Sequence, residues 1–364
     1  MMYTSFLKSA AIAGCVAALT LSGAAQAAEK LNGSGASFPA PIYAAWFKQF
    51  SQDKAVKKEF NPDGVRVDYQ SKGSGAGIKD LQEGAVDFAG SDAAMSDEEI
   101  AVVKEKQGKD VVLLPMTAGE VVLAFNLEGV KELRLPRDVY PAIFAGEITN
   151  WNDPKIAAAN PGVELPDSKI TVVVRSDSSG TSYVFTGHLA EISPLFKDKV
   201  GQSKSPNWPG QDNFIKAPKN DGVMAQIKQN KGTIGYVEYG FAKLTGHAQV
   251  ALLENKAGNF VAPGPASGAD AVASAEFPQN TLPGGAPDLR AFVNDPAGDN
   301  AYPIASMTWL LLYTEYEAAK LKAVQDMIAY LTSDAAQGQA DSFGYIPLPA
   351  DVIAKVQEAL KVIK

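Results

Sequence analysis

Three short segments rich in Gly, Ser and Thr have the composition of an anion-binding site. They are residues 33–39, 73–77 and 175–182, and each precedes a stretch of helical character. A helix N-terminus presents unpaired N–H groups and the positive end of the helix dipole. Glycine lets an oxyanion approach the backbone, hydroxyl groups add donors, and Arg175 adds a charged bidentate fork. Three such segments meeting at one point could replace the hydration shell of a small tetrahedral anion.

The same composition is also typical of ordinary helix capping. Ser, Thr and Gly are among the commonest residues at helix starts, so capping alone would explain any one of the three segments. The segment 175–182 adds Arg175 and a second charged residue, Asp177, which favours an anion site. From composition alone, both interpretations remain open.

Other kinds of site lack the residues or the spacing that they need. The sequence contains no phosphate-binding P-loop, no dinucleotide-binding glycine motif and no nucleophile elbow. Its two histidines, His188 and His247, follow glycines beside apolar residues and are interpreted as structural. With so few histidines and one cysteine, we expect no catalytic residue, no metal and no cofactor. The net charge of −8 argues against nucleic acid as a partner.

The N-terminus has the pattern of an export signal. Lys8 precedes an uncharged, apolar stretch at residues 9–21, and an Ala-Gln-Ala cleavage pattern ends at Ala27. The apolar stretch is too short to span a bilayer. We therefore predict a signal peptide at residues 1–27 and a periplasmic mature protein without a thiol. Cys15 lies in a sequence that also resembles a lipoprotein processing site, so lipid anchoring remains an alternative.

The elements that must position these segments alternate between strands and helices. A chain of 364 residues exceeds the usual size of one hydrophobic core, so two domains are expected. Apolar patterns predict helices around residues 42–50, 321–331 and 352–363. They predict strands at residues 65–69, 111–114, 120–126, 171–174 and 302–313. This alternation predicts an α/β architecture with largely parallel sheets.

Residues 256–299 interrupt the alternation. They are rich in Gly, Pro, Ala, Asp and Asn and show little apolar periodicity, which predicts a long surface excursion. The strand-like pattern then resumes at residues 302–313. A return to order after such a detour is typical of a domain that is interrupted and later completed.

Several motifs together resemble the periplasmic phosphate-binding proteins of phosphate-specific ATP-binding cassette (ABC) importers. The strongest resemblance lies in residues 175–182, and the others run in the family's order along the chain. These are residues 31–41, 86–92, 143–148, 151–154 and 235–239. The resemblance extends from about Leu31 to Pro347, and residues 256–299 are its least typical part.

The resemblance implies a fold, a ligand and a partner. The fold is α/β, with two doubly wound domains joined by hinge strands and the ligand in the cleft, the periplasmic binding protein-like II fold. Domain I is expected at residues 28–118 and 300–364, and domain II at residues 119–299. The implied function is phosphate binding by a monomer that delivers phosphate to the membrane permease of an ABC importer, without enzymatic activity.

Carried over residue by residue, the resemblance also implies the phosphate ligands. They are Ser37, Phe38 through its backbone N–H, Ser74, Asp92, Arg175, Ser179, Gly180 and Thr181. Asp177 is expected to hold Arg175. The family usually has Thr where this chain has Ser37, a change that keeps the hydroxyl and loses a methyl group.

Asp92 gives the resemblance a testable chemistry. A carboxylate beside an anion is favourable only if the ligand donates a proton to it, which phosphate can do near neutral pH and sulfate cannot. A site built to accept a hydrogen bond rejects an analogue that lacks the donor. Alternatively, Asp92 could cap the helix that the acidic residues just beyond it begin.

Three other functions remain to be weighed. A receptor for another oxyanion, such as sulfate or molybdate, is disfavoured by Asp92. A secreted phosphatase would need a nucleophile beside a base, or a metal pair, and the sequence offers neither. An adhesion or surface-structural protein would not need the three intact loops.

Overall fold

The computed structural model describes residues 30–210 and 212–364. The predicted signal peptide, its cleavage site after Ala27 and Cys15 lie outside the described residues. Within the described part of the chain, every helix is too short or too polar to cross a membrane.

One eight-stranded sheet runs through the molecule, and a three-stranded sheet accompanies one end of it. The strand order of the large sheet is β2-β1-β3-β11-β4-β8-β6-β7, and that of the small sheet is β10-β9-β5. The large sheet contains β1 (Lys30–Gly35), β2 (Arg66–Ser71), β3 (Phe88–Ser91), β4 (Val111–Asn126), β6 (Thr171–Arg175), β7 (Phe214–Ala217), β8 (Thr233–Glu238) and β11 (Ala305–Tyr313). The small sheet contains β5 (Arg134–Leu135), β9 (Leu252–Glu254) and β10 (Phe260–Val261).

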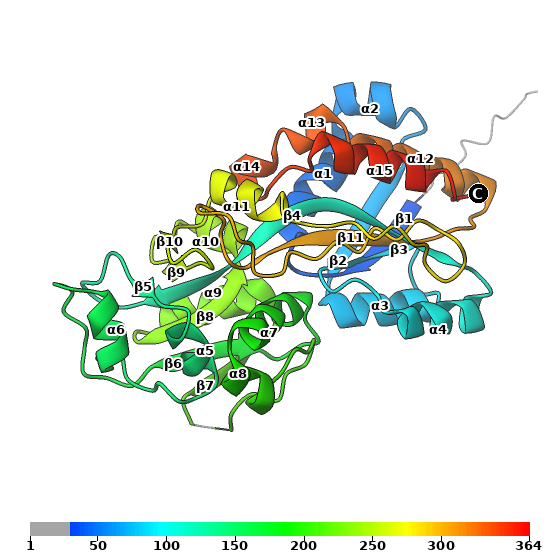
Figure 1. The fold of residues 1–364 in the computed structure, drawn as a ribbon. Helices are drawn as coiled ribbons and strands as arrows, with labels where there is room; N and C mark the ends of the chain where they lie inside the picture. Colours follow the sequence, from blue (N-terminus) through cyan, green and yellow to red (C-terminus); the bar gives the residue numbers. More distant parts are fainter. Residues whose placement is uncertain (1–29, 211) are drawn as a thin grey trace, which may run out of the picture.

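Strand β4 joins two lobes. Its residues 111–120 pair with β11 in the first lobe, and its residues 121–126 pair with β8 in the second. With 16 residues, it extends about 50 Å at the usual rise of a strand. Figure 1 shows β4 passing from the lobe that carries both ends of the described chain into the lobe built from the middle of the sequence.

The prediction of two separate strands at residues 111–114 and 120–126 was wrong, because β4 is continuous. Pro115 lacks the N–H that a strand interior normally uses, which made a break the natural interpretation. In the structure the pairing with β11 shifts register here, so that Trp309 pairs with Pro115 and Thr308 with Thr117. The bulge leaves Met116 without an opposite residue and lets the strand pass through the proline.

The α/β fold class is confirmed, although the sheet is mixed rather than largely parallel. Strands β2, β1 and β3 are parallel in the first lobe, and β8, β6 and β7 are parallel in the second. The two central strands, β11 and β4, run antiparallel to their neighbours. The sequence pattern could not reveal this, because a buried strand has the same apolar composition in either direction.

Helices cover both faces of the sheet in each lobe. In the first lobe, α3 and α4 lie on one face, and the other helices of that lobe lie on the opposite face (Figure 1). The first lobe contains α1 (Ala40–Gln52), α2 (Lys54–Phe60), α3 (Ser74–Gln82), α4 (Asp97–Gln107), α12 (Ala318–Leu331), α13 (Asp334–Gln337), α14 (Ala340–Phe343) and α15 (Ala350–Leu360). The second contains α5 (Val139–Phe144), α6 (Pro154–Ala159), α7 (Gly180–Ile192), α8 (Pro194–Lys199), α9 (Lys219–Gln229) and α10 (Tyr239–Leu244).

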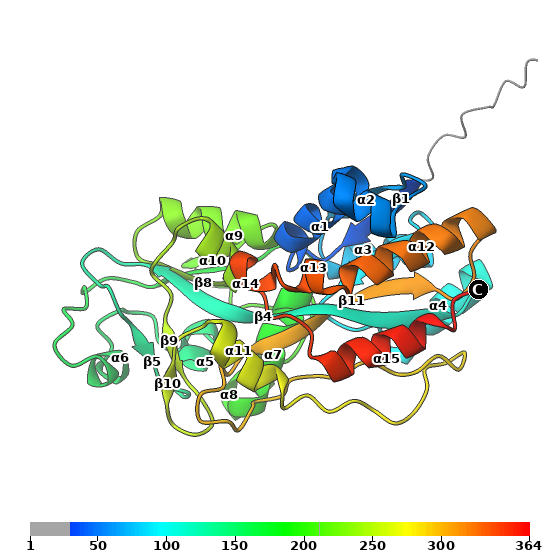
Figure 2. The same cartoon turned by 90° about the horizontal axis from the view of Figure 1, so that it is seen from above.

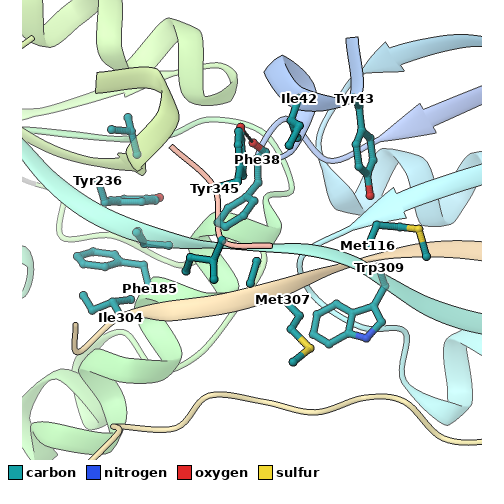
Figure 3. Close-up of a cluster of buried hydrophobic side chains, with 14 of the residues drawn as sticks. Phe38, Ile42, Tyr43, Met116, Phe185, Tyr236, Ile304, Met307, Trp309 and Tyr345 are labelled. Atoms are coloured by element: carbon teal, nitrogen blue, oxygen red, sulfur yellow. Dashed lines mark hydrogen bonds between the residues drawn. The ribbon is translucent and has the colours of Figure 1, made fainter. Parts of the chain in front are cut away.

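The hydrophobic core continues from one lobe into the other along β4. Figure 3 shows Phe38 and Tyr345 of the first lobe and Tyr236 and Phe185 of the second lobe, all close to β4. These four side chains are fully buried and belong to one cluster of buried residues. The two lobes therefore share packing at the strand that connects them.

Residues 256–299 contain more order than predicted. They include β10 and the helix α11 (Pro265–Val272), after which a long loop runs along the first lobe (Figure 2). Arg290 Nη1 donates to the carbonyl of Met95 at 3.0 Å, and Trp309 Nε1 donates to the carbonyl of Leu289 at 2.8 Å. The loop is thus attached to the first lobe, while the domain boundary at residue 299 stays a prediction.

Glu120 fastens α11 to β4 at the point where β4 changes pairing partner. Its Oε1 accepts a hydrogen bond from Ser267 Oγ at 2.9 Å, and its Oε2 accepts one from the N–H of Gly264 at 2.8 Å. Burial raises the pKa of Glu120 to about 8, although both hydrogen bonds favour the ionised form.

We predict that Glu120→Gln flattens the dependence of stability on pH. In the folded protein the pKa of Glu120 lies above its ordinary value of 4.5, so its stabilising contribution is full below that value and is lost as the pH rises towards 8. The melting temperature of the wild type should therefore fall between pH 5 and pH 8 more steeply than that of Glu120→Gln. Glu128→Gln, at an exposed glutamate, should keep the wild-type slope. Equal slopes in all three proteins would contradict the prediction.

Candidate functional site

The first lobe places three of the predicted residues at the carboxyl ends of its parallel strands. Ser37 follows β1, Ser74 follows β2 as the first residue of α3, and Asp92 follows β3. The carboxyl ends of parallel strands meet at one edge of a sheet, where α/β proteins commonly bind ligands. All three side chains are buried.

Phe38 is fixed in the first lobe by the C-terminal part of the chain. Its side chain is fully buried and packs edge-on against Tyr345, with ring centres 6.3 Å apart. Tyr345 Oη donates a hydrogen bond to the carbonyl oxygen of Phe38 at 2.6 Å, as Figure 3 shows. This contact holds the backbone of the loop between β1 and α1.

The second lobe contributes the end of β6 and the beginning of α7. Arg175 is the last residue of β6, and Ser179 caps α7 by accepting a hydrogen bond from the N–H of Ser182 at 3.0 Å. Gly180 and Thr181 form the first turn of the helix. The N–H groups of this first turn have no acceptor within the helix, and the positive end of the helix dipole lies at Gly180 and Thr181.

Arg175 is held in place by two neighbours. Its Nε and Nη2 donate to the two carboxylate oxygens of Asp177 at 2.9 and 2.5 Å, and its Nη1 donates to Thr181 Oγ1 at 3.2 Å. Burial alone would raise the pKa of Asp177, but the hydrogen bonds and charge of Arg175 outweigh burial and lower that pKa. The guanidinium is therefore oriented towards the beginning of α7.

The two lobes touch at these same segments. The N–H of Gly75 in the first lobe donates to the carbonyl of Ser178 in the second at 3.0 Å. Lys204 in the second lobe forms an ion pair with Glu99 of α4 in the first. In this structure the two lobes are therefore in contact.

Glycine is required where the lobes meet most closely. A Cβ atom added to Gly180 would lie 2.6 Å from Asp92 Oδ2, and one added to Gly73 would lie 2.5 Å from Asp177 Oδ2. Gly73 also has a φ of +99°, which side chains rarely tolerate. At Gly73 the group that approaches the backbone is the Asp177 carboxylate of the opposite lobe. The composition of the loop did not suggest that Gly73 makes room for this carboxylate.

Asp92 has one carboxylate oxygen that the protein does not satisfy. Its Oδ1 accepts a hydrogen bond from Thr308 Oγ1 at 3.0 Å, and its backbone N–H donates to Ser74 Oγ at 3.2 Å. Its Oδ2 is fully buried and has no hydrogen-bond partner among the described residues. Burial raises the pKa of Asp92 to about 7, against the opposing effects of the Thr308 hydrogen bond and of Arg175.

The alternative interpretation of Asp92 as a helix cap was wrong. Helix α4 begins at Asp97, and Ser96 is its N-cap, in a reciprocal capping box with Glu99. Asp92 lies further upstream, directly after β3, and its side chain bonds to Thr308 of β11 instead.

Sequence reasoning missed two residues of this cluster. Asn220, the second residue of α9, donates from Nδ2 to Ser37 Oγ at 2.9 Å and to Thr181 Oγ1 at 3.2 Å. Thr308 bonds to Asp92 from the middle of β11. The position of Thr308 within an apolar strand gave no signal. The only signal at Asn220 was the sequence Pro-Lys-Asn-Asp-Gly, which is typical of a turn.

The two histidines bond elsewhere. His188 Nε2 lies 2.9 Å from Tyr140 Oη, and His247 Nε2 lies 2.8 Å from the carbonyl oxygen of Phe125. Across residues 30–210 and 212–364, no three His, Cys, Asp or Glu side chains gather in a way that could hold a metal ion. The cluster around Asp92 thus consists of hydroxyl, amide, guanidinium and carboxyl groups.

The fold and this cluster define a two-lobed binding protein, in which donors from both lobes surround a buried carboxyl group. A family model described as a PBP superfamily domain matches residues 21–335. The chain is 36% identical to the phosphate-binding protein PstS of Pasteurella multocida, over 92% of this chain and 90% of that one. It is 34% identical to PstS of Haemophilus influenzae, over 92% and 93%.

A solved structure shows the same fold. The phosphate-binding protein from Stenotrophomonas maltophilia superimposes with a TM-score of 0.67 at 22% identity, covering 91% of this chain and 94% of that one. The chain belongs to the PstS family of phosphate-binding proteins within the PBP superfamily.

We predict that Thr308→Val raises the pKa of Asp92 further above its ordinary value. The threonine hydroxyl stabilises the ionised carboxylate, and valine has the same shape without the donor. Carbon-detected NMR of the Asp92 carboxyl group across a pH titration measures the change. Thr314→Val, at a threonine that bonds to the carbonyl of Asp110, should leave the pKa of Asp92 at the wild-type value. An unaltered Asp92 titration in Thr308→Val would contradict this role.

Proposed function

We propose that this protein is an extracytoplasmic receptor that binds inorganic phosphate between its lobes and delivers it to the membrane permease of an ABC importer. Membership of the PstS family supports the ligand and the transport role. The single observation that carries the proposal is the buried Oδ2 of Asp92, which has no hydrogen-bond partner among residues 30–210 and 212–364 and lies beside Gly180 at the start of α7.

The chemistry around Asp92 favours a ligand that both accepts and donates hydrogen bonds. Arg175 and the beginning of α7 supply positive charge and donors for oxygen atoms of an anion. Asp92 Oδ2 needs a hydrogen, and a phosphate near neutral pH carries one. Sulfate has none to offer, so an ionised Asp92 would face its lone pairs without a hydrogen bond.

The proposed ligand set is the one that the resemblance implies. The hydroxyls of Ser37, Ser74, Ser179 and Thr181, the N–H groups of Phe38 and Gly180, and the guanidinium of Arg175 donate to phosphate. Asp92 accepts its proton, and Asp177 orients Arg175. In this proposal the lobes, at residues 28–118 with 300–364 and at residues 119–299, move about the strands that join them.

The cellular setting of the proposal follows from the N-terminal sequence. A signal peptide at residues 1–27 would export the protein to the periplasm, where it would act as a monomer. Lipid anchoring through Cys15 is the alternative mode of attachment. Mass spectrometry of the mature N-terminus distinguishes cleavage after Ala27 from lipidation.

A binding role accounts for the cluster better than catalysis does. The two histidines bond elsewhere, so neither serves as a base beside a hydroxyl of this cluster. Incubation with a chromogenic phosphate ester should give no turnover. A receptor for sulfate or molybdate would not explain why a carboxyl group is buried among the donors.

We predict tight binding of phosphate by the wild type and a large loss in Arg175→Ala. The guanidinium is buried, and removing one partner of a desolvated charge pair costs about 2–5 kcal/mol, or roughly 30-fold to several thousand-fold in affinity. Calorimetric titration with phosphate measures the loss, and tryptophan fluorescence follows closure. Arg134→Ala, at an exposed ion pair, should bind like the wild type. Absence of phosphate binding by the wild type would refute the proposed function.

We predict that Asp92→Asn weakens discrimination against sulfate. The amide can donate to an unprotonated oxyanion, so the roughly 10⁴–10⁵-fold preference expected of such a site should shrink by about tenfold or more. Because the pKa of Asp92 is raised to about 7, sulfate binding by the wild type should strengthen as the pH falls below this value. In Asp92→Asn this dependence should disappear. Competition calorimetry with both anions decides the matter, and unchanged selectivity would contradict the role of Asp92.

A further inference from the structure

We propose that Asn220 is a positioning residue that orients the hydroxyls of Ser37 and Thr181 so that they donate hydrogen bonds to the ligand. Because Ser37 lies in the other lobe, this orientation of its hydroxyl requires contact between the lobes. The inference rests on the proposed phosphate-binding function. It assigns a role to a fully buried amide that lies outside the predicted ligand set.

The orientation of the Asn220 amide is set by the backbone of the second lobe. Its Oδ1 accepts a hydrogen bond from the N–H of Glu238, at the end of β8, at 2.9 Å. A backbone N–H can only donate, so the amide oxygen must face it. The Nδ2 group therefore faces the two hydroxyls, Ser37 Oγ at 2.9 Å and Thr181 Oγ1 at 3.2 Å.

Both hydroxyl oxygens already accept two hydrogen bonds. Ser37 Oγ accepts from Nδ2 and, at 3.2 Å, from the backbone N–H of Asn220. Thr181 Oγ1 accepts from Nδ2 and, at 3.2 Å, from Arg175 Nη1. A hydroxyl has two acceptor lone pairs and one hydrogen. The O–H hydrogen of each is therefore the group left to bond to a ligand.

This arrangement suits an anion in particular. A free hydroxyl can rotate to donate or to accept, whereas these two can only donate to a ligand once their oxygen atoms accept from Asn220 and Arg175. Donors fixed in this way need no reorientation when an anion binds, which favours the bound state. The same restriction disfavours a ligand that would have to donate to Ser37 or Thr181.

Asn220 also links ligand binding to closure. Ser37 belongs to the first lobe, whereas Asn220 and Thr181 belong to the second. The hydrogen bonds between Asn220 and Ser37 thus cross from one lobe to the other, and they form only when the lobes are together. Ser37 acquires its restricted, donating state in the same step that brings it to the ligand.

The test is calorimetric titration with inorganic phosphate of Asn220→Asp and Asn220→Ala. The aspartate can still accept from the N–H of Glu238, but it presents an acceptor to both hydroxyls and adds negative charge. We expect a loss of affinity of about 30-fold or more in Asn220→Asp and a smaller loss in Asn220→Ala. Asn213→Asp is the matched control, because Asn213 is a second-lobe amide that donates to the carbonyl of Ile170. Its affinity should equal that of the wild type.

A combined variant separates positioning from a merely structural role. If Asn220 acts through the two hydroxyls, then Asn220→Ala should cost little further affinity in a protein that already carries Ser37→Ala and Thr181→Val. Full additivity, or wild-type affinity in a folded Asn220→Asp, would overturn the inference. Melting temperatures without phosphate verify folding, and if Asn220→Asp does not fold, the Asn220→Ala comparison decides. Failure of the wild type to bind phosphate would instead refute the proposed function.

Discussion

The structure depends on how a buried carboxyl group, Asp92, is accommodated. A charge removed from water is costly unless hydrogen bonds and opposite charge compensate for it. Here Thr308 satisfies one oxygen and Arg175 supplies nearby positive charge, while the other oxygen has no hydrogen-bond partner in the part of the chain that the structure describes. Such a site is incompletely paired by itself, and a ligand that carries both acceptors and a hydrogen would complete it. In the proposed function, binding and discrimination between ligands thereby rest on the same atom.

The fold gathers the compensating groups from segments far apart in the sequence. Parallel strands in each lobe end at the edge facing the other lobe, so their loops converge on one point. The continuous strand β4 and the shared core keep the two lobes attached, while the loops meet across the interface. Glycines 73 and 180 keep this meeting point free of side chains, and Asn220 links a hydroxyl of each lobe. The positions of the side chains in the cluster around Asp92 thus depend on contact between the two lobes.

Much of this was accessible from the sequence because its signals are local. Apolar periodicity indicated the helices at residues 42–50, 321–331 and 352–363, and each lies within or overlaps a helix of the structure. Loop composition identified the segments that hold Ser37, Ser74 and Arg175, and the family motifs identified Asp92. Pro115 gave a false signal of a strand end, because its usual effect on a strand is offset by a bulge that depends on the partner strand.

The sequence by itself determined the α/β class, the Gly, Ser and Thr content of the three loops and the family, because each is encoded in short stretches of residue types. Only the tertiary structure decided that β4 is one strand, that the central strands are antiparallel, and that Asp92 is not a helix cap. It also decided that Asn220 and Thr308 belong to the cluster. These features depend on pairing between residues that are up to 224 positions apart, as in the pairing of Leu312 with Phe88, and composition and periodicity carry no information on such long-range contacts.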